Sequence, residues 1–145
     1  TVSFQSNYQR GRAQPLLRGA ASRIILAYLP ANNLRRIYEA QPDVCAIAGL
    51  GDSLDAFRAR LRQIRQTGWD TTSADVTPNV TGIAAPIFDG RGMILASLSL
   101  TIGQPDLPTD RLKLIADQVM FGAGIVTRAM AQHQAQNGAL ERPPS

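Results

Sequence analysis

The fold is decided by residues 80–101, which read VTGIAAPIFDGRGMILASLSLT. Two runs rich in β-branched and other apolar residues, Val80–Phe88 and Met93–Thr101, flank the short segment Asp89–Gly92. The two glycines of that segment are typical of a tight β-hairpin turn. The sequence therefore predicts two antiparallel strands, and we expect Phe88 to pair with Met93 across the turn.

The predicted register separates an apolar face from a polar one, because side chains alternate between the two faces of a strand. On the polar face, Val80, Gly82 and Ala84 lie beside three residues with hydroxyl side chains, Ser97, Ser99 and Thr101. The apolar face, which we expect to form the core, pairs Ile87 with Ile94, Ala85 with Ala96, Ile83 with Leu98, and Thr81 with Leu100.

The polar face of the hairpin has two interpretations. One is an ordinary solvent-facing side of an antiparallel sheet, which is often polar. Such a side usually carries long charged residues, however, and Lys, Arg, Asp and Glu are all absent from these positions. Small polar residues around a hollow suit a site that hydrogen-bonds a compact ligand.

Helices and shorter strands are predicted on both sides of the hairpin. A helix begins near Gly19–Ser22 and ends before Pro30, and Ser53 and Gly68 are natural caps for another. The segment 41–52, rich in Pro and Gly, is predicted to be a loop. The remaining expected elements are strands over Thr1–Tyr8 and Trp69–Thr72, a helix over Asn33–Ala40, and a helix over Thr109–Ala131 that buries Leu112, Ile115, Ala116, Val119, Ala123, Val126 and Met130.

Length and composition indicate one globular domain. The chain has 145 residues, of which 44% are hydrophobic and 18% charged. No apolar run approaches the roughly 20 residues that span a bilayer, and Thr1–Arg10 lacks the pattern of a signal peptide. Cys45 is the single cysteine, which favours a reducing compartment, so we expect a cytoplasmic protein that does not contact a membrane.

The net charge of +4 raises the question of nucleic-acid binding. Arg58, Arg60, Arg62 and Arg65 lie on the helix after Ser53, and its apolar stripe places most of them on the opposite, exposed side. No aromatic or glycine-rich motif accompanies these arginines. We therefore expect a solvated helix face here rather than a surface that reads DNA.

Signals for catalysis, metals or cofactors are weak. His133 is the only histidine and has no cluster of cysteines or carboxylates at metal-binding spacing. A Ser-His-Asp set cannot be proposed, and Cys45 fits a small apolar residue better than a reactive thiol. We therefore predict no catalytic residue, no metal and no cofactor, and regard the protein as a non-enzyme.

Several runs resemble the effector-binding domain of the IclR family of bacterial transcriptional regulators. The resemblance covers about residues 4–130, and its most specific part is the run IAAPIFD at 83–89 followed by ASLSL at 96–100. Earlier matches are Pro15-Leu16, Ala20–Arg23 and Leu26–Pro30, and then Leu54, Leu61–Arg65 and Gly68-Trp69.

The resemblance implies a GAF-like α/β (α+β) fold, with an antiparallel sheet flanked by helices. It also implies a metabolite-sensing regulator that forms homodimers or homotetramers and binds DNA only through a winged helix-turn-helix domain absent from this chain. The first helix and strand of the sensor are absent too. We therefore expect an N-terminally incomplete effector-binding domain over residues 1–131, followed by a flexible C-terminal tail over 132–145.

The resemblance also implies a ligand site, because the family's effector meets the start of the first helix and two strands of the hairpin. The ligand-binding positions implied in this sequence are Ala20, Ala21, Thr72, Val80, Gly82, Ser99 and Thr101. An acidic residue is common in the family where Thr72 stands, and a cysteine where Gly82 stands. Gly82 enlarges the hollow, so we expect an organic acid different from, and bulkier than, glyoxylate or pyruvate.

Arg18 and Arg23 are candidates for an additional charge contact with the carboxylate of the acid. The simpler interpretation is that each is an exposed surface arginine. Three other functions stay open on the sequence alone. The first is a GAF-like sensor that serves a different output, such as a kinase or cyclase. The second is a hydrolase that uses Ser99 or Cys45. The third is a purely structural dimerisation module, if side chains fill the pocket.

Overall fold

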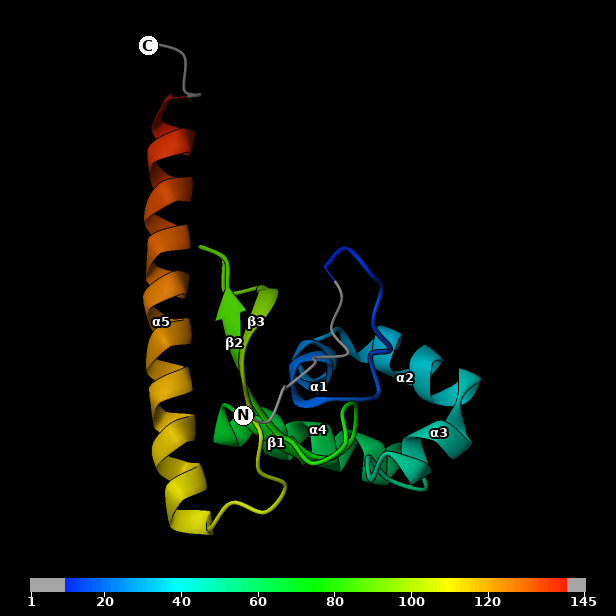
Figure 1. The fold of residues 1–145 in the computed structure, drawn as a ribbon. Helices are drawn as coiled ribbons and strands as arrows, with labels where there is room; N and C mark the ends of the chain where they lie inside the picture. The colour runs from blue at the N-terminus through cyan, green and yellow to red at the C-terminus, as the bar shows by residue number, and fades with distance from the viewer. Residues whose placement is uncertain (1–9, 141–145) are drawn as a thin grey trace.

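The computed structural model describes residues 10–140, and in Ala139 and Leu140 only the backbone. An antiparallel sheet with the strand order β1-β2-β3 lies between one long helix and a group of shorter helices (Figure 1). The predicted α+β class, with an antiparallel sheet flanked by helices, is therefore confirmed. In chain order the elements are α1 (Ala20–Ala27), α2 (Ala31–Ala40), α3 (Pro42–Ile47), α4 (Leu54–Thr67), β1 (Asp70–Ser73), β2 (Thr81–Phe88), β3 (Ile94–Ile102) and α5 (Thr109–Leu140).

The observed hairpin register differs by two residues from the predicted one. Ile83 pairs with Leu100 rather than with Leu98, and a bulge between Ile87 and Phe88 lets Phe88 pair with Ile94. The prediction was wrong because the sequence pattern does not reveal this bulge. Since the side-chain period of a strand is two residues, the slip leaves the side chains before the bulge on their predicted faces. Beyond the bulge, Ile94 pairs with Phe88 and therefore lies on the face opposite to the predicted one.

The core is divided between the two faces of the sheet. Ile83, Ala85 and Ile87 of β2 pack with buried residues of α5, which confirms the β2 part of the predicted apolar face, whereas Leu100 of β3 is exposed. On the other face, Ala84 joins a second cluster formed by side chains of α1 to α4 and their connections, with Phe57, Leu26 and Leu61 fully buried. The face that was predicted to be polar is therefore covered in its middle by α1.

The caps predicted for α4 are confirmed. The Ser53 Oγ accepts a hydrogen bond of 3.1 Å from the Ala56 N–H, and Gly68 ends the helix in a left-handed conformation with φ of 79°. The predicted loop over 41–52 is wrong in part, because α3 begins with Pro42 at its first turn and places Cys45 in the core. The predicted strand over Thr1–Tyr8 lies outside the described residues.

The last helix is longer than predicted. It continues past Ala131 to Leu140, and the Gln134 Oε1 accepts a hydrogen bond of 2.6 Å from the Gly90 N–H in the hairpin turn. The predicted start of a tail at Gln132 therefore does not coincide with the end of the helix. Ala116, Val119 and Ala123 are buried as predicted, whereas Val126 is 38% exposed.

The outer side of α5 is apolar as well. Leu114, Phe121 and Ile125 are exposed there. Over Thr109–Gly138 the helix has a mean hydropathy of 1.2 in its most apolar window, so by length and composition it is able to span a membrane. The expectation that no segment meets this criterion is corrected, but the criterion alone is weak evidence because the core helix of a soluble protein also satisfies it.

Candidate ligand-binding site

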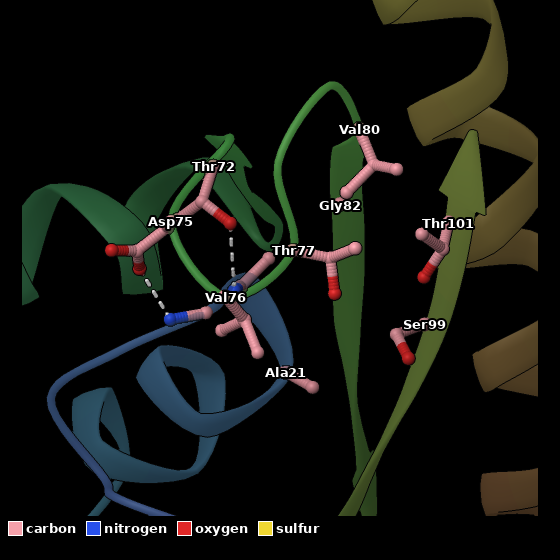
Figure 2. A pocket seen from close by; sticks show the side chains of 11 residues that line it. Ala21, Thr72, Asp75, Val76, Thr77, Val80, Gly82, Ser99 and Thr101 are labelled. Carbon is pink, nitrogen blue, oxygen red and sulfur yellow. Dashed lines mark hydrogen bonds between the residues drawn. The ribbon is translucent and has the colours of Figure 1, made fainter. Parts of the chain in front are cut away.

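A small cavity lies where the start of α1 meets all three strands and the β1–β2 loop (Figure 2). The structure brings all seven predicted ligand-binding residues together around it, although whether they bind a ligand stays a prediction. It also adds Gly19 from the turn before α1 and three residues from the loop. The cavity is lined by Gly19, Ala20, Ala21, Thr72, Asp75, Val76, Thr77, Val80, Gly82, Ser99 and Thr101.

One row of cross-strand neighbours forms the floor of the site. Thr72 of β1 pairs with Gly82 of β2, which pairs with Thr101 of β3. Because Gly82 has no side chain, the start of α1 approaches the sheet closely: a Cβ added at Gly82 would lie 3.7 Å from the Ala20 Cβ and 3.5 Å from the Thr72 Oγ1. These are ordinary van der Waals distances, so alanine would fit at this position and a longer side chain would enter the site.

The start of α1 supplies backbone N–H groups, which a helix leaves without intrahelical acceptors in its first turn. Two of these N–H groups are already used by side chains of this chain. The Gly19 N–H donates to the Asp75 Oδ2 at 2.5 Å, and the Ala20 N–H donates to the Thr72 Oγ1 at 3.1 Å. For the Ala21 N–H, residues 10–140 provide no hydrogen-bond acceptor.

Asp75 was not predicted from the sequence, yet it is the carboxylate at the centre of this arrangement. Its side chain is held between the Gly19 N–H and Arg18, whose Nε lies 3.7 Å from the Asp75 Oδ1 and whose Nη2 donates to the Asp75 carbonyl oxygen. A carboxylate at the N-terminus of a helix is stabilised by free N–H groups and by the positive end of the helix dipole. The chain thus fills its own anion site.

The β1–β2 loop carries Asp75 and closes the cavity. Its two ends, Ala74 and Asn79, are the non-glycine residues with positive φ among those described, at 54° and 59°. This conformation costs an L-residue such as alanine about 1–2 kcal/mol. The Ala74 N–H donates to the Val80 carbonyl at 2.8 Å and so joins the ends of the loop.

The cavity is small in this conformation. Its volume is about 30 Å³, which is enough for about one or two water molecules. The cavity is small although Gly82 adds no side chain to it, because the start of α1 and Thr72 lie over the glycine. The expectation that Gly82 makes room for a bulkier acid stays a prediction. The hydroxyls of Ser99 and Thr101 are exposed at the rim, and within residues 10–140 neither forms a hydrogen bond.

A buried ion triad supports α1 beneath the site. The Arg23 Nε lies 2.9 Å from the Asp70 Oδ2, and the Arg60 Nη2 of α4 lies 3.0 Å from the Asp70 Oδ1. The first contact is an ion pair without the alignment of a hydrogen bond. Burial lowers the pKa of Arg23, and the neighbouring Asp70 carboxylate partly offsets this shift. Arg23 is therefore committed to Asp70 and not to a ligand.

The structure gives no support to catalysis by Ser99 or Cys45. Cys45 is fully buried, and burial raises the pKa of its thiol, which opposes formation of a reactive thiolate. His133 lies on α5, with its Nε2 3.1 Å from the Asn137 Nδ2. Among residues 10–140, no three side chains of the His, Cys, Asp or Glu types are grouped so that they could hold a metal ion.

Comparison with known proteins identifies similar sequences and folds. The model of the family described as bacterial transcriptional regulator IclR C-terminal matches residues 2–123. The HTH-type transcriptional regulator KdgR of Escherichia coli is 24% identical over 123 residues, which cover 85% of this chain and 47% of KdgR. The HTH-type transcriptional regulator KipR of Bacillus subtilis is 28% identical over 121 residues, covering 81% of this chain and 47% of KipR.

Solved structures agree on the fold. The repressor BlcR of Agobacterium tumefaciens superposes with a TM-score of 0.70 at 17% identity, covering 86% of this chain and 51% of BlcR. The C-terminal domain of the same KdgR superposes with a TM-score of 0.66 at 22% identity, covering 83% of this chain and 74% of that domain. The chain therefore spans about half the length of the curated relatives that it matches.

Proposed function

The chain belongs to the IclR family of bacterial transcriptional regulators, whose C-terminal domain it matches, and we propose that it senses a small organic acid on behalf of such a regulator. In this proposal the acid binds the cavity between α1, the sheet and the β1–β2 loop. The regulator binds DNA through a winged helix-turn-helix domain outside this chain. It acts in the bacterial cytoplasm as a homodimer or homotetramer, without a cofactor and without catalysis.

The observation that carries this proposal is the Asp75 carboxylate on the Gly19 N–H, at 2.5 Å. A carboxylate from the chain itself already occupies the start of α1, so this position is suited to the carboxylate of a ligand. The free N–H of Ala21 and the hydroxyls of Ser99 and Thr101 then remain for the other polar atoms of the acid. The site would thus recognise a carboxylate at one end and hydrogen-bonding groups at the other.

Binding requires the acid to displace Asp75. A cavity of about 30 Å³ cannot admit even a small organic acid unless the β1–β2 loop moves outward. The positive φ of Ala74 places backbone strain at one end of this loop, and outward movement of the loop would relieve it. The ligand would therefore favour an open loop over the closed one, and this difference in affinity is what a sensor needs in order to respond.

The exposed side of α5 supports the proposed assembly of several copies. Leu114, Phe121 and Ile125 recur at spacings that bring them onto one side of the helix. Large apolar side chains gathered on a surface favour association with another protein surface. Through such contacts, movement of the β1–β2 loop would change how paired sensors place their DNA-binding domains.

The test is calorimetry with glyoxylate, pyruvate, succinate and benzoate, using the wild-type chain and the double variant S99V/T101V. We expect at least one acid to bind, and to bind about tenfold more weakly to the variant, because two hydrogen bonds to the ligand are lost. S97V is the matched control: Ser97 lies on the same face but does not line the cavity.

Three results would contradict the proposal. The first is that none of the four acids binds the wild-type chain. The second is equal affinity of S99V/T101V and wild type, which would place the binding site elsewhere. The third is an equal loss in S97V, which would show a general effect on the sheet; thermal unfolding of all three proteins establishes that each is folded.

A further inference from the structure

A second hollow lies at the opposite end of α1 from the candidate site. Its volume is about 280 Å³, several times that of the first cavity. Since α1 has eight residues, its two ends lie about 12 Å apart. The hollow is lined by Ala27, Tyr28, Leu29, Ala31, Leu34, Arg58, Arg62 and Arg65, and we call it the arginine hollow.

The arginine hollow has positive charge on one wall and an apolar surface on the other. Arg58, Arg62 and Arg65 stand on one side of α4, where helical spacing makes them neighbours. Among residues 10–140, none of the three forms an ion pair with a carboxylate. Arg60, the other arginine of this helix, points elsewhere and pairs with Asp70. The expectation of a simple solvated face therefore needs revision: these arginines border a hollow.

Unpaired like charges at this spacing oppose each other. Like charges one helical turn apart destabilise a helix. Arg65 is in addition held in place, because its Nη1 donates to the Ala27 carbonyl at 2.7 Å. An anion between the three guanidinium groups would remove the repulsion and meet at least one donor group that is already positioned.

Two more groups in the hollow favour an anion. Ala31 opens α2, and its N–H group has no acceptor among residues 10–140. Tyr28 also lines the hollow, and burial raises the pKa of its phenol, which therefore stays protonated and able to donate a hydrogen bond. The apolar part of the lining, from Ala27, Leu29 and Leu34, suits a ligand that also has a carbon skeleton.

We propose that the arginine hollow is a second ligand site, distinct from the cavity at the start of α1, and that it binds a small organic polyanion. Di- or tricarboxylates and phosphate esters share the required chemistry, namely two or more negative charges on a compact carbon skeleton. Arginine guanidinium groups bind both carboxylate and phosphate in bidentate geometry. A hollow of this volume fits one such molecule.

Calorimetry with citrate and with phenyl phosphate tests the proposal and distinguishes the two sources of polyanion. Sulfate at matched ionic strength controls for screening. We expect one of the two probes to bind the wild-type chain with a stoichiometry of one, and R58Q/R62Q to weaken that binding about tenfold or more. The control R36Q/R111Q removes the same charge from exposed arginines of α2 and α5 and should retain wild-type affinity.

A second control separates the arginine hollow from the cavity at the start of α1. S99V/T101V alters the cavity at the start of α1 and should leave citrate and phenyl phosphate binding unchanged, so failure of one site is distinguishable from failure of the other. Binding of neither probe, equal binding by R58Q/R62Q, or equal loss in R36Q/R111Q would overturn the proposal. Arg58- and Arg62-dependent binding of duplex DNA that citrate and phenyl phosphate do not displace would overturn it too, in favour of a nucleic-acid surface.

Discussion

The two ends of α1 attract anions in opposite ways. At its start, the Gly19 N–H is occupied by a carboxylate of the same chain, that of Asp75. At its end, three arginines border the arginine hollow, and among the described residues no carboxylate pairs with them. The start of α1 is thus closed and neutralised, whereas the arginine hollow is open and retains its positive charge.

This difference concerns how a site selects its ligand. Where an internal carboxylate occupies the site, a ligand must compete with it, and binding is coupled to movement of the loop that carries it. Where positive charge is left without a counterion, a ligand needs only to fit and to neutralise it. The first arrangement suits a sensor, and the second suits a site that is ready to bind without a change of shape.

The largest expected effect comes from breaking the ion pairs of Asp70, which hold Arg23 of α1 and Arg60 of α4. D70A leaves Arg23 buried without its counter-charge, so we expect unfolding to become easier by about 3–5 kcal/mol, the usual penalty for breaking a buried pair. Urea denaturation measures it. R60Q is the comparison, since Arg60 is partly exposed, and should cost about 1 kcal/mol or less. Equal losses in D70A and R60Q would argue against a buried triad.

A smaller effect is expected from R65Q, which changes the end of α1 but not its start. R65Q removes the hydrogen bond to the Ala27 carbonyl and a positive charge at the C-terminal end of α1, so we expect a stability loss of about 1 kcal/mol. Citrate or phenyl phosphate binding should weaken as well, while acid binding at the start of α1 should not change. A parallel loss of affinity at both sites would mean that the two ends are not independent.

The smallest expected effect is on the titration of Tyr28. Because burial raises the pKa of Tyr28, its phenol should titrate above the ordinary value of about 10. The folded state then holds the proton more tightly than the unfolded state, so this group's contribution to stability is present below pH 10 and falls as the pH rises through the folded pKa.

Ultraviolet titration of wild type against Y28F isolates this signal, and Y38F is the control. Citrate or phenyl phosphate in the arginine hollow should raise the pKa of Tyr28 further, because the anion offsets the charge of Arg65. A Tyr28 that titrates at or below its ordinary value would contradict the described environment.

Much of the fold follows from local patterns in the sequence. The caps of α4 and the two faces of the hairpin up to the bulge were predicted correctly, because each depends on neighbouring residues or on alternation along a strand. The pairing register of β2 and β3 was predicted incorrectly, because the bulge at Ile87 and Phe88 leaves no periodic signal in the sequence. Likewise α3 has only six residues, too few for a helical repeat to be visible.

Some residues of the candidate site were likewise predicted from the sequence, and one was missed. Thr72, Gly82 and Thr101 were predicted as site residues, and the structure places them in one cross-strand row. Asp75 was missed because its position depends on a loop whose shape is set by positive φ at Ala74 and Asn79, and alanine carries no sequence signal for that conformation. The family resemblance supplied positions on regular elements but not the loop that closes over them.

The most direct test of this account compares the affinity of D75N and wild type for the tightest-binding acid of the four. D117N, an exposed aspartate of α5, is the control for the change in net charge. If Asp75 competes with the ligand, D75N should bind the acid about tenfold more tightly, because the occupied form of the site is weakened. Unchanged or weaker binding by D75N would contradict the central claim that the chain's own carboxylate holds the place of the effector.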